Sequence, residues 1–329
     1  MKENNNSEFA IIERYFQGSS ARSDVLLGIG DDAALLTPPP GQSLVVTVDL
    51  LAAGVHFLAD ADPRGIGHKS LAVNLSDLAA MGAEPAWGTL AIALPGVEPD
   101  WLAAFCEGFF SLAEQYNLQL VGGDTTRGPL TISVQVHGFV PADQALRRDG
   151  ARPGDRIMIT GIPGEAALAL AGLQGRAELP GAHRDTLLAR LERPSPRIVQ
   201  GLDLRGLATS AIDISDGLVQ DLGHILRRSQ VGARLLLERL PRSVALQGVE
   251  PGLALDCQLG GGDDYELLFT VAPPRLAELR RRAAAWDCEL TEIGEIKTGG
   301  DLRLIRADGS VYTPTTGGFD HFAGIQSHD

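Results

Sequence analysis

The feature that most constrains this chain is a pair of adjacent aspartates, Asp31 and Asp32, which follow two glycines and the apolar run Val25–Leu27. Neighbouring carboxylates repel each other, which costs little in an exposed loop but requires a cation in a cleft. Acids beside glycine or next to apolar segments recur along the chain, at Asp49, Asp77, Asp124, Asp213, Asp216, Asp263 and Asp264. We therefore expect a scaffold that brings scattered aspartates to one site. For Asp31 and Asp32 taken alone, an exposed loop is the alternative.

Length, charge and cysteine usage narrow the class of protein. A chain of 329 residues predicts two domains or one large one. No apolar run reaches ~18 residues and the polar start Met1–Asn6 lacks a signal-peptide core, so we expect a cytoplasmic protein without a membrane partner. The three cysteines, which lack metal-ligand spacing, fit reduced thiols. A net charge of −14 argues against nucleic acid as the main partner, but not against phosphates, because bound metal ions invert the local charge.

Strand and helix patterns alternate in both halves of the chain, which predicts an α/β or α+β fold. The turn cluster Ala151–Asp155 predicts a domain boundary that divides the chain into residues 1–150 and 151–329. In the first half we expect helices at 7–17, 62–81 and 99–116, and strands at 45–49, 87–94, 118–121 and 130–140. In the second half we expect helices at 216–228 and 274–286, and strands at 156–160, 208–214, 266–271 and 290–296.

The acids of the first half fall where α/β proteins build sites. Asp49 and Asp124 are expected at the ends of strands, and Asp77 lies beside the predicted buried stripe of a helix. Each is weak alone, because such an aspartate is more often a cap or a turn residue. Together, oxygen ligands without clustered cysteine or histidine favour Mg²⁺ or Mn²⁺ over zinc, and Thr47 could add a hydroxyl.

A second acidic motif, Asp213–Gly217, falls at an expected strand-to-helix junction. Capping of the helix by Ser215 or Asp216 explains it locally. A functional interpretation adds that Asp213 precedes a helix N-terminus, where a metal-bound phosphate would gain from backbone N–H groups.

Other motifs are weaker or absent. Arg147 and Arg148 are surface residues or phosphate contacts, and His56 carries little weight alone. The spacing of Gly28, Gly30 and Ala33 imitates a dinucleotide-binding loop, which we reject because two carboxylates stand where the pyrophosphate would approach. The P-loop, the protein-kinase signatures and the Gly-x-Ser-x-Gly elbow are all missing. A nucleotide would therefore bind through metal bridges.

Six motifs in this order closely resemble the bacterial thiamine-monophosphate kinases, a family of the aminoimidazole-ribonucleotide synthetase-like superfamily. The resemblance spans about residues 7 to 322. Single motifs are shared across the superfamily, whereas the full set with its terminal Gly-Phe-Asp-His-Phe is specific. The motifs are Gly28–Ala34, Asn74–Gly82, Gly122–Gly128, Ala211–Leu218, Gly261–Leu267 and Gly318–Phe322.

The resemblance implies a two-domain fold of that superfamily, with an N-terminal metal- and ATP-binding domain and a C-terminal α/β domain that completes the active site. It implies ATP-dependent phosphorylation of thiamine monophosphate to thiamine diphosphate with several Mg²⁺ ions, and a homodimer that pairs through its N-terminal sheets. Carried over by position, the implied metal ligands are Asp32, Thr47, Asp49, Asp77, Asp124, Asp213 and Asp216, with Asp31 as a supporting acid. The implied ATP contacts are Gly123, Asp124, Arg148 and Ser215, and the implied substrate contacts are His56, Asp263 and Phe319.

Two departures from the family pattern bear on these roles. The family usually has threonine at Val48, so a metal contact there must use the backbone carbonyl. It usually has glutamate at Asp263, so the acid that reaches the substrate is shorter here. No catalytic base is expected, because the acceptor is already an anionic phosphate and the main barrier is repulsion between two phosphates, which Mg²⁺ ions relieve.

Rival functions remain at this point. Selenophosphate synthetase needs a reactive cysteine near the N-terminal glycines, but the first cysteine is Cys106. A hydrogenase-maturation carbamoyl dehydratase ends in a cysteine tail, whereas this chain ends Ser327–Asp329. Aminoimidazole-ribonucleotide synthetase lacks the terminal motif. An acidic module that binds divalent metal or senses nucleotide is the non-enzyme alternative.

Overall fold

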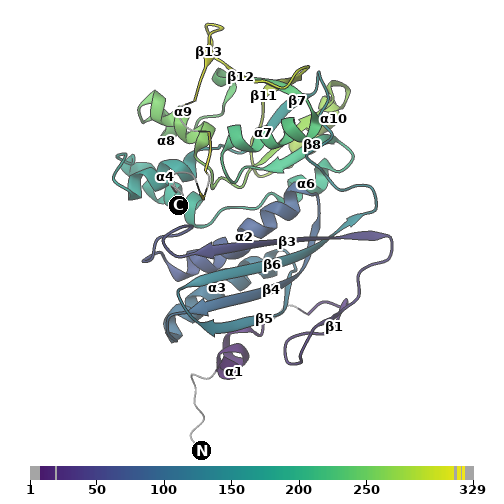
Figure 1. The fold of residues 1–329 in the computed structure, drawn as a ribbon, viewed down its shortest axis with the longest axis vertical. Coiled ribbons are helices and arrows are strands. Elements are labelled where there is room, and N and C mark those ends of the chain that lie inside the picture. Colours follow the sequence, from purple (N-terminus) through teal and green to yellow (C-terminus); the bar gives the residue numbers. More distant parts are fainter. Residues whose placement is uncertain (1–7, 19–20, 315–316, 320, 323–329) are drawn as a thin grey trace, which may run out of the picture. The chain divides into compact units, whose positions relative to one another are not determined.

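The computed structural model describes residues 8–18, 21–314, 317–319 and 321–322. Ser7 of the expected first helix, Asp320 of the terminal motif, and the terminal segments Met1–Asn6 and Ser327–Asp329 lie outside the described residues. The chain divides into two compact units, one of residues 1–145 and 192–202 and one of residues 146–191 and 203–329 (Figure 1). The domain boundary between residues 150 and 151 stays a proposal.

The first unit is built on a four-stranded sheet in the order β3-β6-β4-β5, with helices α2 and α3 on one face (Figure 1). β4 pairs antiparallel with β6 and parallel with β5, and β3 and β5 form the two edges. A small two-stranded sheet, β1-β2, adds Val25 and Leu36 to a core around Trp87 and Phe139. The elements are α1 (Glu8–Ile11), the π-helix η1 (Ile12–Phe16), β1 (Val25–Leu27), β2 (Leu35–Leu36), β3 (Gln42–Ala52), α2 (Pro63–Ala80), β4 (Glu84–Leu94), α3 (Pro99–Gln115), β5 (Gln119–Arg127) and β6 (Thr131–Pro141).

Helix α2 is the buried centre of this unit, and it begins and ends where the sequence predicts. The side chain of Asp62 accepts a hydrogen bond from the Arg64 amide at 3.2 Å, and Pro63 opens the first turn. The helix stops before Gly82, whose φ of +63° suits glycine. The predicted stripe at Leu71, Leu75, Leu78 and Ala79 is fully buried, so Asp77 borders the apolar core.

Glycines allow α2 and α3 to cross at very short range. A β-carbon at Gly67 of α2 would overlap the carbonyl oxygen of Phe105, and one at Gly108 of α3 would overlap the carbonyl oxygen of Arg64. The two helices therefore touch backbone to backbone at this crossing. This close contact keeps α2, with its polar side chains, at a fixed height above the sheet.

The second unit is built on a seven-stranded sheet in the order β13-β12-β9-β11-β7-β10-β8, in which the β12–β9 pair alone is parallel among the described strands. Helix α7 packs on it through Leu218, Leu222 and Ile225, and a second core joins α4, α5, α8 and α9. Its strands are β7 (Arg156–Thr160), β8 (Ala208–Asp213), β9 (Gly232–Leu236), β10 (Leu267–Val271), β11 (Leu290–Lys297), β12 (Leu302–Ile305) and β13 (Val311–Tyr312). Its helices are α4 (Glu165–Leu173), η2 (Gly181–His183), α5 (Arg184–Glu192), α7 (Leu218–Ser229), η3 (Leu237–Arg239), α8 (Val244–Gln247), α9 (Pro251–Gly260), η4 (Pro273–Arg275) and α10 (Leu276–Ala283), while α6 (Ile198–Leu204) spans the division between the units.

Two expected strand ends are wrong. Asp49 lies inside β3, which runs on through Leu50 and Leu51 to Ala52. Asp124 lies inside β5, because Gly123 does not end the strand. A β-carbon at Gly123 would overlap the carbonyl oxygen of Leu90, so glycine is there to let β5 approach β4. The fold class is confirmed, with helices and mixed sheets in both units. Among the described helices, none is long and apolar enough to span a bilayer.

We predict that Gly67→Ala destabilises the protein by ~1–3 kcal/mol or more, because the new methyl group must push α2 away from α3. In an open helix the same change would stabilise by up to about 1 kcal/mol. Gly96→Ala is the control, since a β-carbon there meets nothing within 4 Å. Urea unfolding midpoints measure both. A Gly67→Ala protein as stable as the wild type would contradict the close crossing.

Candidate active-site residues

The first group of candidate residues joins strand β3 to helix α2. The Thr47 hydroxyl donates a hydrogen bond to Asp77 Oδ2 at 2.5 Å, and the amide of Asp49 donates to Asn74 Oδ1 at 3.1 Å. Asn74 is itself held by the bond from its Nδ2 to the Ser70 carbonyl oxygen at 3.1 Å. Thus Thr47, Asp49 and Asp77 come together on the face of the sheet that the helices cover.

The two acids of this group lie close enough to influence each other's ionisation. Burial and, to a smaller extent, the negative charge of Asp77 together raise the pKa of Asp49 from its ordinary 3.8 to about 7. Val48 alternates to the opposite face, where its side chain is 58% exposed, so only its backbone carbonyl is available as a ligand. The Thr47 hydroxyl holds the carboxylate of Asp77, and Asn74 holds the backbone of Asp49, so the two acids are kept close together.

His56 lies in the turn after β3 and is fixed by its own ring. Nδ1 accepts a hydrogen bond from the Ala52 amide at 3.0 Å, so the neutral ring carries its proton on Nε2. The buried Lys69 donates to the His56 carbonyl oxygen at 3.4 Å. The Nε2–H of this neutral ring is a hydrogen-bond donor.

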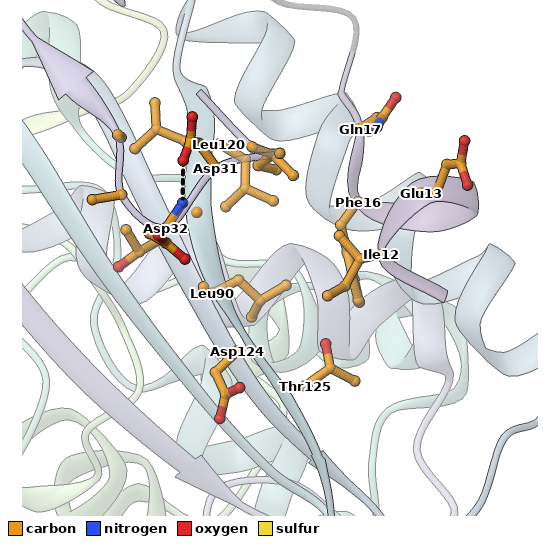
Figure 2. A pocket seen from close by; sticks show the side chains of 18 of the residues that line it. Ile12, Glu13, Phe16, Gln17, Asp31, Asp32, Leu90, Leu120, Asp124 and Thr125 are labelled. Carbon is orange, nitrogen blue, oxygen red and sulfur yellow. Dashed lines mark hydrogen bonds between the residues drawn. The ribbon is translucent and has the colours of Figure 1, made fainter. Parts of the chain in front are cut away.

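A second group lies around a pocket of about 690 Å³ beside β5. Asp31, Asp32, Gly123 and Asp124 line it, and Figure 2 shows the two loop acids across from side chains of η1 such as Phe16. Asp31 Oδ1 accepts a hydrogen bond from the Asp32 amide at 2.8 Å, which turns the loop on itself. Gly30, with a φ of +125°, permits that turn.

The group around Asp49 and the group around Asp124 do not come together within the first unit of a single chain. Asp49 lies on edge strand β3 and Asp124 on edge strand β5, three strand spacings or about 14 Å apart. Pairing also places them on opposite faces, since Asp49 lies opposite Val134 of β6 while Asp124 lies opposite Ala91 of β4 and Ala91 opposite Ser133. Within the part of the chain that the structure describes, no three acidic, histidine or cysteine side chains gather as a complete metal site.

The second unit brings its own candidates together at two loops. Asp213 ends β8 and is almost fully buried, and Ser215 and Asp216 follow in the loop. The amide of Asp263 donates to the Ser215 carbonyl oxygen at 2.8 Å, and the amide of Phe319 donates to the Asp216 carbonyl oxygen at 3.0 Å. The backbones that carry all five residues are thus hydrogen-bonded to one another.

Backbone strain marks the loop of Asp263. Asp263 and Tyr265 have φ angles of +61° and +52°, which are uncommon for residues other than glycine. The Tyr265 hydroxyl donates to Asp263 Oδ1 at 3.0 Å and holds the carboxylate. Between them, Asp264 Oδ1 accepts from the Gly164 amide at 2.8 Å, and burial raises its pKa well above the ordinary value. We interpret Asp264, which has no role in the sequence prediction, as an anchor of this loop.

Asp221, in the first turn of α7, is the residue that sequence reasoning missed. Its Oδ2 accepts hydrogen bonds from the amides of Ser215, Asp216 and Gly217, each at 3.1 Å. Burial and the charge of Asp216 raise its pKa to about 7 against the opposing effect of these bonds. The three amides are therefore occupied, and the expectation that they assist a phosphate is wrong for them. Capping by Ser215 or Asp216 is also wrong, since the N-cap is Gly217. The signal in the sequence that could have found Asp221 is an acid four residues after a glycine at the start of a helix.

The arginines differ in their surroundings. Arg147 is paired with Asp149, with Nη2 to Oδ2 at 2.6 Å, and both are exposed. Arg148 is exposed, and its backbone carbonyl accepts from Ser229 Oγ at 3.0 Å at the C-terminal end of α7. Arg148 therefore has the freer side chain of the two.

Comparisons with known proteins agree along the whole chain. Residues 30–140 match the N-terminal domain of AIR synthase related proteins, and residues 152–306 match their C-terminal domain. The chain is 51% identical over 319 residues to the thiamine-monophosphate kinase of Escherichia coli K12, which covers 96% of this chain and 98% of that protein. A crystal structure of thiamine-monophosphate kinase from Stenotrophomonas maltophilia K279a matches with a TM-score of 0.85 at 48% identity, over 93% of this chain and 98% of that one. A structure described as AaThiL complexed with AMPPCP and TMP matches with a TM-score of 0.75 at 30% identity, over 97% of both chains.

We predict that Asp49→Asn stabilises the metal-free protein at pH 8. The folded state binds the Asp49 proton more tightly than the unfolded state, because the pKa is about 7 instead of 3.8, so stability is lost as pH rises between these values. In EDTA the variant should melt a few degrees above the wild type at pH 8, and the gap should shrink toward pH 5. Asp60→Asn, at an exposed position of the same unit, is the control. A variant that melts at or below the wild type at pH 8 would argue against the buried charge.

Proposed function

This chain belongs to the AIR synthase related proteins and, among them, to the thiamine-monophosphate kinases, and we propose on that premise that it phosphorylates thiamine monophosphate with ATP to form thiamine diphosphate. The observation that carries the proposal is the set of buried or clustered carboxylates in both units, in a family whose 30%-identical member binds AMPPCP and TMP. This combination of carboxylates and a nucleotide-binding relative favours a kinase over a protein that only binds metal.

Mg²⁺ is part of the proposal, and the donor chemistry fits it. The candidate ligands offer carboxylate, hydroxyl and carbonyl oxygens, which are the ligands that Mg²⁺ prefers. The raised pKa of Asp49 beside Asp77 supports a cation at β3 and α2. Because Mg²⁺ is often held by one or two carboxylates plus substrate phosphates, incomplete protein sites suit it. We propose Asp32, Thr47, Val48, Asp49, Asp77, Asp124, Asp213 and Asp216 as ligands, with Asp31 in support.

The acceptor oxygen of thiamine monophosphate attacks the γ-phosphorus of ATP, the bond to the β-bridging oxygen breaks, and ADP leaves. When bound, Mg²⁺ would neutralise the charge on both phosphates. The acceptor phosphate has a second pKa near 6 and needs no general base, so no catalytic base or covalent nucleophile is assigned to this chain. The residues of the chain bind and orient the two phosphate groups. On the ATP side we propose Gly123, Asp124, Arg148 and Ser215.

On the substrate side we propose His56, Asp263 and Phe319. The His56 Nε2–H is a donor, Asp263 is held by Tyr265, and the Phe319 ring is 47% exposed and ready to stack. An acid and an aromatic face both suit the cationic thiazolium ring of the substrate. The hydrogen bond from Tyr265 fixes the direction of the Asp263 carboxylate.

A homodimer is the second part of the proposal. Leu44, Val46, Val48 and Leu50 alternate along edge strand β3 and are between 46% and 58% exposed. An apolar row on an unpaired sheet edge is a surface that proteins normally cover. Pairing of the N-terminal sheets of two protomers would cover it.

The dimer also supplies a way to unite the two acidic groups of the first unit. If β3 of one protomer lies beside β5 of its partner, the sheet edge that carries Asp49 in the first is brought next to the edge that carries Asp124 in the second. A two-fold axis makes two such sites. We therefore propose that each active site is shared between protomers. We also place the protein in the cytoplasm, which its three free cysteines support.

The activity is tested by following ATP turnover with and without thiamine monophosphate. We expect turnover only with the acceptor, its abolition by EDTA, intersecting steady-state lines, and inversion at a chiral γ-phosphate. Turnover of ATP alone would favour another activity of the superfamily. Retention of configuration, or label left on the protein after ATP alone, would overturn the direct transfer.

The shared site is tested by complementation between two inactive variants. We expect Asp49→Asn and Asp124→Asn each to lose most turnover. Random mixed dimers should recover roughly a quarter of wild-type turnover, because each heterodimer rebuilds one intact site. Mixing either variant with itself is the control. No recovery in mixed dimers would show that each site lies within one protomer.

The dimer surface is tested by placing a charge in the apolar row of β3. Val46→Glu should yield a monomer by light scattering, while Val244→Glu, at an exposed valine of the second unit, should not.

A further inference from the structure

Asp221 occupies an unusual position behind the loop that carries Asp213, Ser215 and Asp216. Its side chain is on α7, it is only 2% exposed, and one oxygen collects three consecutive amides of that loop. The N-cap residue Gly217 has a φ of +119° and offers no side chain, so the loop lacks a cap of its own. Asp221 replaces that cap from inside the helix.

Other hydrogen bonds also hold this loop, among them those that the carbonyl oxygens of Ser215 and Asp216 accept from the amides of Asp263 and Phe319. Asp213 belongs to the sheet ladder opposite Leu267, and Gln220 Nε2 donates to Asp216 Oδ2 at 3.1 Å and to the Phe319 carbonyl oxygen at 2.9 Å. After β8, the backbone orientation of Ser215 and Asp216 therefore depends mainly on Asp221 and on the bonds to the Asp263 loop. Bonds to a carboxylate are about twice as strong as bonds to a neutral oxygen, and here three amides share one charge.

We propose that Asp221 is a positioning residue: by binding the three amides it aims the Asp216 carboxylate and the Ser215 hydroxyl outward, toward the metal–nucleotide complex. This inference rests on the proposed function, because it takes Asp216 as a metal ligand and Ser215 as an ATP contact. In this proposal Asp221 acts through the loop and not on the metal or substrate, because it is buried and its Oδ2 is bonded to the loop amides. Its loss should weaken metal–nucleotide binding more than binding of the acceptor.

The test compares Asp221→Asn with a matched buried acid. Asparagine keeps the shape and one acceptor oxygen but removes the charge. Asp155→Asn is the control, because Asp155 is 4% exposed in the same unit and its Oδ2 likewise accepts from the Arg152 amide at 2.9 Å and the Thr209 hydroxyl at 2.7 Å, away from the candidate residues. Mn²⁺ binding is titrated calorimetrically with a non-hydrolysable ATP analogue present, melting temperatures are recorded, and hydrogen exchange is followed in peptides that cover residues 215–217.

We expect Asp221→Asn to weaken Mn²⁺ binding by about tenfold or more and to speed exchange of the loop amides. The Michaelis constant for the acceptor should stay near the wild-type value. Asp155→Asn should lower the melting temperature without changing Mn²⁺ affinity. Wild-type Mn²⁺ affinity in a folded Asp221→Asn protein would overturn the inference alone. A wild-type protein that binds no Mn²⁺ with the analogue would overturn both the metal site and the inference, whereas missing turnover with intact Mn²⁺ binding would count only against the proposed kinase activity.

Discussion

The structure depends on hydrogen bonds from hydroxyl and amide groups that position a few partly or fully buried aspartates. The Thr47 hydroxyl donates a hydrogen bond to Asp77, and Asn74 accepts one from the backbone amide of Asp49. Three loop amides donate hydrogen bonds to Asp221. Dipoles of this kind orient a carboxylate but leave most of its charge uncancelled. Burial then raises the free energy of the charged form, which appears as the pKa of about 7 at both Asp49 and Asp221. At Asp49 the proposed divalent cation and the phosphates that it binds would share this charge, whereas at Asp221 the three loop amides offset part of the cost of burial.

The need to position these aspartates also explains why helix α2 packs so closely against α3. Asn74 and Asp77 must meet β3 at a defined height, and α2 has little freedom because Gly67 and Gly108 bring its backbone against α3. In a helix with a looser contact, side-chain reach would vary from one conformation to the next. Close packing of glycines is thus a means of placing charged groups, since protein interiors deform little.

Much of the fold could be predicted because strong local signals agree with it. Asp62 and Pro63 begin α2 as predicted, and Ile132, Val134 and Val136 alternate into the core. The errors have physical causes. Glycine usually ends a strand, but Gly123 sits in β5 because β4 approaches too closely for a side chain. Strands β9 and β12 are only 5 and 4 residues long, too short to show a clear alternation, so their pairing becomes evident only in the sheet.

The candidate residues could be named from motifs, but their grouping could not. A motif gives each aspartate a place along the chain, whereas the edge and the face on which it stands follow from strand order and pairing. Asp49 and Asp124 look equivalent in the sequence, yet they stand on opposite edges and opposite faces of one sheet. If both act on the same phosphates, one chain alone is an incomplete enzyme, and the exposed apolar row on β3 is the surface that a second copy would complete. Dimerisation is then a condition of catalysis and not only of stability.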